Sequence, residues 1–116
     1  MEDLTLNLKG SAHLKGVKEE ALGRIAREIR NVVPGILMML AFGSVNHGDE
    51  PGDIDLAMVV PDGYNSIDTL RALAPVLARQ SILNGLLTTC FPIGESELLH
   101  GKSQFSRNVR DTGRAI

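Results

Sequence analysis

Two aspartates separated by one residue, Asp53 and Asp55, are the side chains of this sequence best suited to chemistry. In a β-strand, residues i and i+2 point to the same face, so the two carboxylates project together. Two carboxylates that close repel each other unless a cation lies between them. Hard oxygen ligands suit Mg²⁺ or Mn²⁺, which bind through a few carboxylates and the phosphates of a substrate. The pair therefore predicts a site for divalent metal ions.

A small-residue turn, Gly43-Ser44, precedes the aspartates, and eight residues separate Ser44 from Asp53. Gly43 allows a phosphate to approach the backbone closely, and Ser44 offers a hydroxyl and an N–H. A Gly-Ser dipeptide alone is usually only a turn, and an Asp-x-Asp alone usually opens a strand. Their combination, in the order strand, turn, loop and strand, predicts a site for a polyphosphate and its metal ions.

Apolar spacing in the first half of the chain predicts the elements that hold this turn and these aspartates. A helical pattern runs over 17–33 and is ended by Pro34-Gly35. Unbroken apolar runs over 36–42 and 53–60 predict strands that are buried on both faces. The weak alternation of the first ten residues indicates a short edge strand.

In the second half, Asn65 or Ser66 can cap a helix, which Pro75 is expected to kink or divide. The apolar stripe expected to face the core of this helix consists of Ile67, Leu70, Leu73, Ala74 and Leu77. A third strand is expected over 86–91, ending at Pro92. The helix-prone tail from residue 95 can dock through Leu98, Leu99, Phe105 and Val109. The order of elements predicts an α/β fold.

Composition sets limits on the class of protein. The 116 residues fit one domain, 1–116, and no apolar run is long enough for a membrane span. Because the N-terminus lacks the pattern of a signal peptide, we expect a cytoplasmic protein. The net charge of −2 argues against general affinity for duplex DNA. The one cysteine, Cys90, lies in an apolar run and is expected to be buried and inert.

Residues 36–60 resemble the core of the minimal nucleotidyltransferases of the polymerase-β superfamily, including kanamycin-type enzymes and small antitoxin-like proteins paired with HEPN partners. Their signature is a Gly-Ser turn followed by an Asp-x-Asp strand. Here it runs Phe42-Gly43-Ser44, then Gly48, then Asp53-Ile54-Asp55-Leu56. The tail over 103–116 resembles the closing helix of these short proteins, which leaves only residues 1–16 without a counterpart.

This resemblance implies a palm-like α/β fold with a mixed central sheet flanked by helices. It also implies transfer of a nucleoside monophosphate, AMP from ATP being the expected case, to an acceptor hydroxyl while pyrophosphate leaves. Gly43 and Ser44 would hold the triphosphate. Asp53 and Asp55 would be the catalytic residues that hold Mg²⁺ or Mn²⁺.

The sequence departs from the family pattern at a third acid, which usually opens the next strand and completes the metal site that activates the acceptor. No carboxylate occurs between residues 81 and 91, and the slot is expected to hold Asn84 or Gly85. Glu95 and Glu97 are the nearby acids that could stand in for it, although they more readily open a helix. His47 takes the place of the basic residue that usually follows the turn.

Two functions therefore remain open at the level of sequence. The first is a Mg²⁺-dependent transferase whose acceptor lies on a partner protein, an RNA end or a small molecule. In so short a chain, a HEPN-type or other co-encoded partner, or a homodimer, would complete the acceptor site. The alternative is a degenerate nucleotidyltransferase that binds nucleotide or partner without efficient turnover, which the missing third acid favours.

Overall fold

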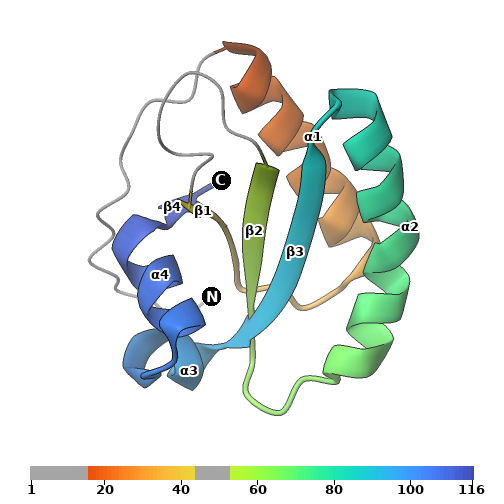
Figure 1. Ribbon diagram of the computed structural model, residues 1–116. Coiled ribbons are helices and arrows are strands. Elements are labelled where there is room, and N and C mark those ends of the chain that lie inside the picture. Colours follow the sequence, from red (N-terminus) through yellow and green to blue (C-terminus); the bar gives the residue numbers. More distant parts are fainter. Residues whose placement is uncertain (1–15, 44–52) are drawn as a thin grey trace.

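A computed structural model describes residues 16–43 and 53–116, and shows helices packed on both faces of a four-stranded sheet (Figure 1). In chain order the elements are α1 (Gly16–Val32), β1 (Met38–Phe42), β2 (Asp53–Val60), α2 (Ser66–Asn84), β3 (Leu87–Gly94), α3 (Glu95–His100), α4 (Gln104–Thr112) and β4 (Arg114–Ala115). This is the α/β fold expected from the sequence. The expected N-terminal edge strand, Ser44, His47 and Gly48 lie outside the described residues.

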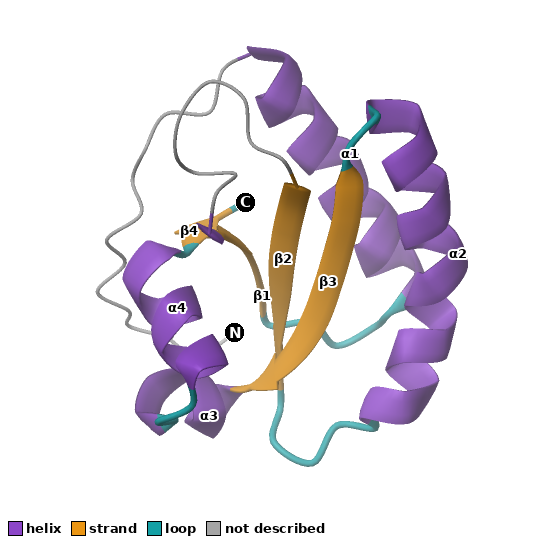
Figure 2. Cartoon of the chain, in the orientation of Figure 1, coloured by secondary structure: helices purple, strands orange, loops and turns teal. Residues whose placement is uncertain are grey.

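The sheet is mixed, as predicted, with the strand order β3-β2-β1-β4 (Figure 2). β1 pairs antiparallel with both β2 and β4, whereas β2 and β3 run parallel. A parallel pair requires a crossover connection, which α2 provides. β2 has the predicted bounds, and β1 begins two residues after the predicted start at residue 36.

Side chains alternate along β2 between two apolar clusters on opposite faces of the sheet. Ile54, Leu56 and Met58 pack toward α1 and α2, whereas Ala57 and Val59 pack toward α3 and α4. This alternation explains the unbroken apolar sequence of a strand that is buried on both faces. Asp53 and Asp55 share the parity of Ala57 and Val59, so they project on the face that carries α3 and α4.

The sequence identified α2, its N-cap and part of its buried face, since Leu73 is fully buried and Leu77 packs against the core. Asn65 caps the helix, because its side chain accepts a hydrogen bond from the Asp68 N–H, and the helix continues past Pro75 without a division. Ile67 is 66% exposed, contrary to the prediction. The residues buried on α2 are Thr69, Leu73, Val76 and Gln80.

Two of these buried α2 residues are polar, which explains why apolar periodicity identified only part of the buried face. Thr69 donates its hydroxyl to the Asn65 carbonyl, and Gln80 donates its amide to Glu28 of α1. Because both side chains are hydrogen-bonded, they can be buried at little expense in free energy. Leu70 and Ala74 of the predicted stripe are exposed like Ile67.

β3 continues through Pro92 to Gly94, so the predicted end of this strand at Pro92 is wrong. Proline is compatible with the position because β3 is an edge strand and needs no N–H on its outer side. On the same strand, the Thr88 N–H donates to the Ser81 hydroxyl at 2.9 Å. Cys90 is buried, as predicted, and its burial raises the pKa of the thiol to about 12.

The tail forms two helices, α3 and α4, and then a short strand, β4, that pairs with β1. Leu98 and Val109 are fully buried against the sheet, and Leu99 and Phe105 pack beside them, as predicted. Among the described residues, no helix has both the length and the apolar character that a membrane span requires. The tail packs on the second face of the sheet through these side chains.

Candidate functional site

The predicted site residues that the structure describes meet at one end of the sheet, where β1 ends and β2 begins. The antiparallel register places Phe42, the last residue of β1, opposite Asp55 of β2. Asp53 is exposed and Asp55 is half-buried. The two aspartates share one face of β2, as the Asp-x-Asp spacing predicted. Ser44, the remaining predicted site residue, lies outside the described residues.

The carboxylate of Asp55 is held by a neighbouring strand. The hydroxyl of Thr89, on β3, donates a hydrogen bond of 2.8 Å to Asp55 Oδ1. The other oxygen, Oδ2, points toward Gly43, since a Cβ built on this glycine would lie 3.5 Å from it. One oxygen of Asp55 is therefore fixed by Thr89, while the other faces the Gly-Ser turn.

Gly43 adopts the left-handed backbone conformation, with φ of +73°, in which glycine is strongly preferred. Its N–H donates a hydrogen bond of 2.9 Å to the hydroxyl of Thr112, the last residue of α4. Gly43 therefore turns the chain away from β1 beside Asp55, and its own N–H is engaged by the protein. Gly43 can therefore serve the site through its backbone conformation and by letting a ligand come close to the backbone, rather than by donating its N–H.

Neither Asn84 nor Gly85 occupies the position of the third acid, so this prediction is wrong. Asn84 is the last residue of α2 and accepts a hydrogen bond from Arg24, while Gly85 caps the helix with φ of +67°. β3 begins only at Leu87, because α2 extends further than its apolar pattern indicated. The parallel register places Leu87 beside Asp53 and Thr89 beside Asp55.

Glu95 and Glu97 are likewise excluded as substitutes for the third acid. Because β2 and β3 are parallel, Gly94 at the end of β3 lies beside Val60, at the opposite end of β2 from Asp53. Both glutamates belong to the first turn of α3, as the preferred interpretation predicted. The carboxylate of Glu97 accepts hydrogen bonds from Ser103 and Ser106, which satisfy it within the tail.

Two carboxylates therefore remain for a divalent cation. No cluster of three or more His, Cys, Asp or Glu side chains suited to a metal ion occurs within residues 16–43 and 53–116. Asp53 makes no hydrogen bond or ion pair to any of these residues, and Asp55 Oδ2 lies beside the Gly43 turn. Two such ligands suit Mg²⁺ or Mn²⁺, which complete their coordination with water and substrate phosphates. Asp53 and Asp55 would hold the ion.

Apolar side chains continue from the carboxylates along the same face of β3. Leu87 is 60% exposed and Phe91 is 48% exposed. The ring of Phe105 from α4 contacts the rings of Phe42 and Phe91 edge-on, with centroids 5.8 and 6.3 Å apart. An open groove of about 460 Å³ is lined by Ser66, Phe91, Pro92 and Phe105. The surface next to the carboxylates thus offers apolar contacts.

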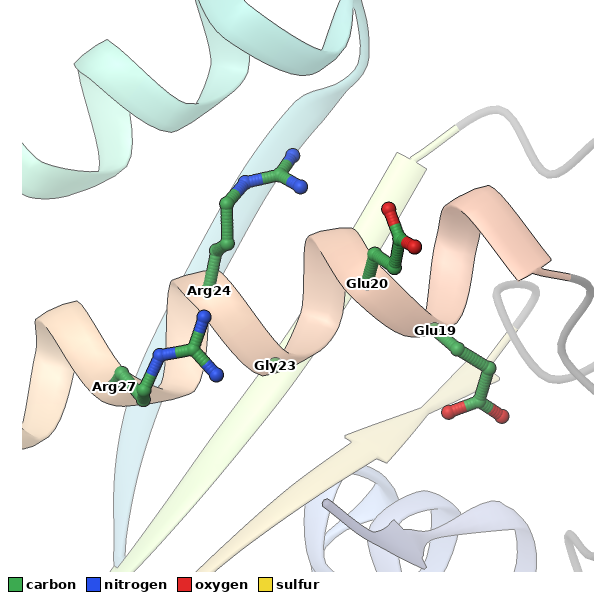
Figure 3. A pocket seen from close by; sticks show the side chains of 5 residues that line it. All are labelled: Glu19, Glu20, Gly23, Arg24 and Arg27. Atoms are coloured by element: carbon green, nitrogen blue, oxygen red, sulfur yellow. The ribbon is translucent and has the colours of Figure 1, made fainter.

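A second hollow, of about 450 Å³, lies on α1 beside Gly23 (Figure 3). Charged side chains surround it, but Glu19 pairs with Arg114 at 2.9 Å and Arg24 donates to Asn84. Since α1 packs on the face of the sheet opposite to Asp53 and Asp55, this hollow is separate from the carboxylate site.

Comparison with known proteins gives no matching family model and no match among curated proteins. Solved structures do match. One similar chain comes from a tri-AMPylated Shewanella oneidensis HEPN toxin in complex with an MNT antitoxin. It aligns with a TM-score of 0.59 and 15% identity over 84% of this chain and 70% of the other. The chain has the minimal nucleotidyltransferase fold.

Two further structures show the same fold. One is a toxin–antitoxin pair, MntA–HpeT, that carries two Asp-to-Glu substitutions, with a TM-score of 0.59, 15% identity and coverage of 80% of this chain and 69% of that one. The other is a toxin–antitoxin with AMP-PNP, with a TM-score of 0.53, 17% identity and coverage of 84% and 70%. At such identities, the similarity concerns the fold, which agrees with the fold expected from the signature.

Thr89 and Thr112 are the site residues that the sequence did not reveal. Thr89 would have followed from the parallel register had the first residue of β3 been known, because it then faces Asp55. Thr112 lies 69 residues from Gly43 and ends a polar helix. No local pattern indicates such a contact.

Proposed function

We propose that this chain is a Mg²⁺- or Mn²⁺-dependent nucleotidyltransferase of cytoplasmic location that transfers AMP from ATP to an acceptor hydroxyl. The observation that carries the proposal is the arrangement of Asp55. Thr89 fixes one of its oxygens, and the other faces Gly43; Asp53, which bonds to none of the described residues, lies on the same face of β2. Such a pair of carboxylates next to a glycine turn is suited to a cation-bound triphosphate.

In this proposal the side chains position and bind. Asp53 and Asp55 would hold the metal ion, which neutralises phosphate charge and stabilises the leaving pyrophosphate. Gly43 would let the phosphates approach the backbone, and Ser44 would contribute its hydroxyl and N–H. The acceptor oxygen forms a bond to the α-phosphorus, the bond from this phosphorus to the pyrophosphate oxygen breaks, and the acceptor proton leaves to solvent.

The similar structures support a protein as the acceptor. One of them contains a tri-AMPylated HEPN toxin together with an MNT antitoxin, and another was determined with AMP-PNP. The Asp-to-Glu pair in a third lies two residues apart, the spacing of Asp53 and Asp55. We therefore propose a HEPN-type partner as the bearer of the acceptor hydroxyl, with the exposed Leu87 beside Asp53, and Phe91 further along β3, available for contact. A homodimer is the alternative way to complete the site.

The second candidate function is nucleotide or partner binding without efficient turnover. It is favoured by one observation: the residues of β3 that face the aspartates are Leu87 and Thr89, and neither carries a carboxylate. The site would then bind a triphosphate through one metal ion, while the acceptor hydroxyl would lack the ion that activates it.

Calorimetric titration of AMP-PNP in the presence of Mg²⁺ tests the shared part of both candidates. We expect Asp53→Asn and Asp55→Asn each to weaken binding by at least tenfold, because a charged ligand of the cation is lost. The melting temperature of the free protein should hold or rise, since one substitution removes carboxylate repulsion. Asp62→Asn is the matched control, because Asp62 lies at the other end of β2.

Equal binding by the wild type and both aspartate variants would show that the metal site is assigned wrongly. Mass spectrometry then separates the two candidates. With Mg²⁺, ATP and the co-encoded neighbouring protein, a transferase leaves an AMP adduct on the partner, and a binding module leaves none.

A further inference from the structure

Thr112 connects the C-terminal helix to the first residue of the Gly-Ser turn. Its hydroxyl oxygen accepts the N–H of Gly43 at 2.9 Å, and its hydroxyl proton is donated to the Asn108 carbonyl at 2.7 Å. With the proton directed along α4, a lone pair of the oxygen remains for Gly43. The two bonds together fix the orientation of the hydroxyl.

The backbone that carries Thr112 is held on both sides. Before it, Val109 is fully buried, and the guanidinium of Arg110 donates to the carbonyls of Leu98 and Gly101 at 2.7 and 2.6 Å. After it, β4 pairs with β1, with Arg114 beside Ala41. The backbone at Thr112 is therefore held in place by the residues on either side of it.

Gly43 needs such a partner more than other residues would. Glycine has the widest choice of backbone conformations, so its left-handed geometry is stable only when contacts select it. The Thr112 bond selects it from one side, while Asp55 Oδ2 lies close to its Cα on the other. The distance between the turn and the metal-binding carboxylate is thereby set before any ligand arrives.

We propose that Thr112 is a positioning residue for nucleotide binding. It acts through Gly43, by holding the start of the Gly-Ser turn against Asp55, and makes no contact with the nucleotide. The inference rests on the proposed function and adds to it a role for α4: this helix holds Gly43, the first residue of the Gly-Ser turn, in place in the free protein. Because Gly43 is already held in place, less conformational entropy is lost when the nucleotide binds.

Two substitutions of similar size separate the hydroxyl from the shape of the side chain. Thr112→Val keeps the branched shape and removes the hydrogen bond, whereas Thr112→Ser keeps the hydroxyl. We expect Val to weaken binding of Mg²⁺ and AMP-PNP about fivefold to tenfold in calorimetry, and Ser to remain within about twofold of wild type. In transfer assays the loss should fall on KM rather than kcat.

Amide exchange measured by NMR supplies a readout that does not need nucleotide. The Gly43 N–H should be protected in the wild type and in Thr112→Ser, and should exchange faster in Thr112→Val at equal melting temperature. Should the valine variant fail to fold, Thr112→Ala replaces it, since alanine avoids the β-branched contact while still lacking the hydroxyl.

The two proposals fail in different ways. A wild type that binds no nucleotide overturns the proposed function and the role of Thr112 with it. A wild type that binds, with a folded valine variant that binds equally well, overturns the role of Thr112 alone. Equal weakening by valine and serine would show that packing rather than the hydroxyl matters, and would also overturn it.

Discussion

The carboxylates at the two ends of the parallel β2–β3 pair differ in how many hydrogen bonds they accept. Just beyond the end of β2, Asp62 accepts the N–H of Ser96 at 3.1 Å and its hydroxyl at 2.5 Å. These bonds hold the pKa of Asp62 below its ordinary value. At the other end, Asp55 accepts a single bond from Thr89, and Asp53 accepts none from the residues that the structure describes.

The difference separates carboxylates that are hydrogen-bonded within the fold from carboxylates that remain available for the proposed metal ion. At the Asp62 end, Ser96 bonds to Asp62, and Ser103 and Ser106 bond to Glu97. These bonds fix the turns on either side of α3. At the Asp53 end, free oxygens lie beside a left-handed glycine. Their demand for a positive partner is met by no side chain of the described residues, which is expected if a metal ion is the partner.

The largest effect should come from disturbing the satisfied end. A Cβ on Gly101 would lie 2.4 Å from the Glu97 carbonyl and 2.5 Å from the Ser106 hydroxyl. We expect Gly101→Ala to lower the free energy of unfolding by about 1–3 kcal/mol, because the α3–α4 turn must move. Denaturant titration measures the change.

The matched control for this substitution is Gly23→Ala in α1. Its Cβ has room, with the nearest atom 3.7 Å away, and a helical alanine should raise stability by up to about 1 kcal/mol. If both glycine substitutions stabilise the protein, the α3–α4 turn is not the rigid unit that its hydrogen bonds indicate.

An intermediate effect is expected when the vacant ligand position is filled. Thr89→Asp places a third carboxylate beside Asp55, and should tighten Mn²⁺ binding about tenfold while lowering the stability of the metal-free protein. Thr88→Asp is the control, since Thr88 is buried and its carboxylate would destabilise the fold without improving the site. Calorimetry with Mn²⁺ measures the first effect and thermal unfolding the second.

If the wild type transfers AMP readily and Thr89→Asp improves neither Mn²⁺ binding nor transfer, the proposed role of position 89 is wrong. The third ligand would then come from a partner chain. The site at Asp53 and Asp55 would then need a carboxylate from another chain, and Thr89 would not stand in the place of the third acid.

The smallest effect concerns pH. Because the pKa of Asp62 is lower in the folded protein, its contribution to stability is fully present above the unfolded value of about 3.9 and is lost as the pH falls through the folded value. The stability difference between wild type and Asp62→Ala should therefore be constant near neutral pH and shrink below pH ~4. Unfolding titrations at several pH values would show it. A difference that persists unchanged at the lowest pH would mean that Asp62 contributes through packing alone.

Sequence patterns were reliable where one physical effect dominated. β2 alternates between two apolar faces, so its run of Ile, Leu, Met and Val identified both the strand and its bounds. The Asp-x-Asp spacing placed both acids on one face for the same reason. The N-cap of α2 was equally local, because Asn65 bonds to Asp68 three residues away.

Patterns failed where the deciding contact was distant or polar. The pattern missed Thr69 and Gln80 on the buried side of α2, because their burial depends on hydrogen-bond partners that apolar periodicity does not detect. The expected third-acid position fell on Asn84 and Gly85 because the apolar pattern did not show that α2 continues to Asn84. The bond between Gly43 and Thr112 joins residues 69 positions apart in the sequence, and only the assembled fold shows it.

The outer edge of β3 has a consequence for aggregation. An exposed edge strand with apolar side chains such as Leu87 and Phe91 is ordinarily a template on which a second chain can add by backbone pairing. Here the Thr88 N–H is already bonded to Ser81, and Pro92 has no N–H to give. The strand can therefore expose an apolar surface near Asp53 and Asp55 of β2 and still resist growth into an intermolecular sheet.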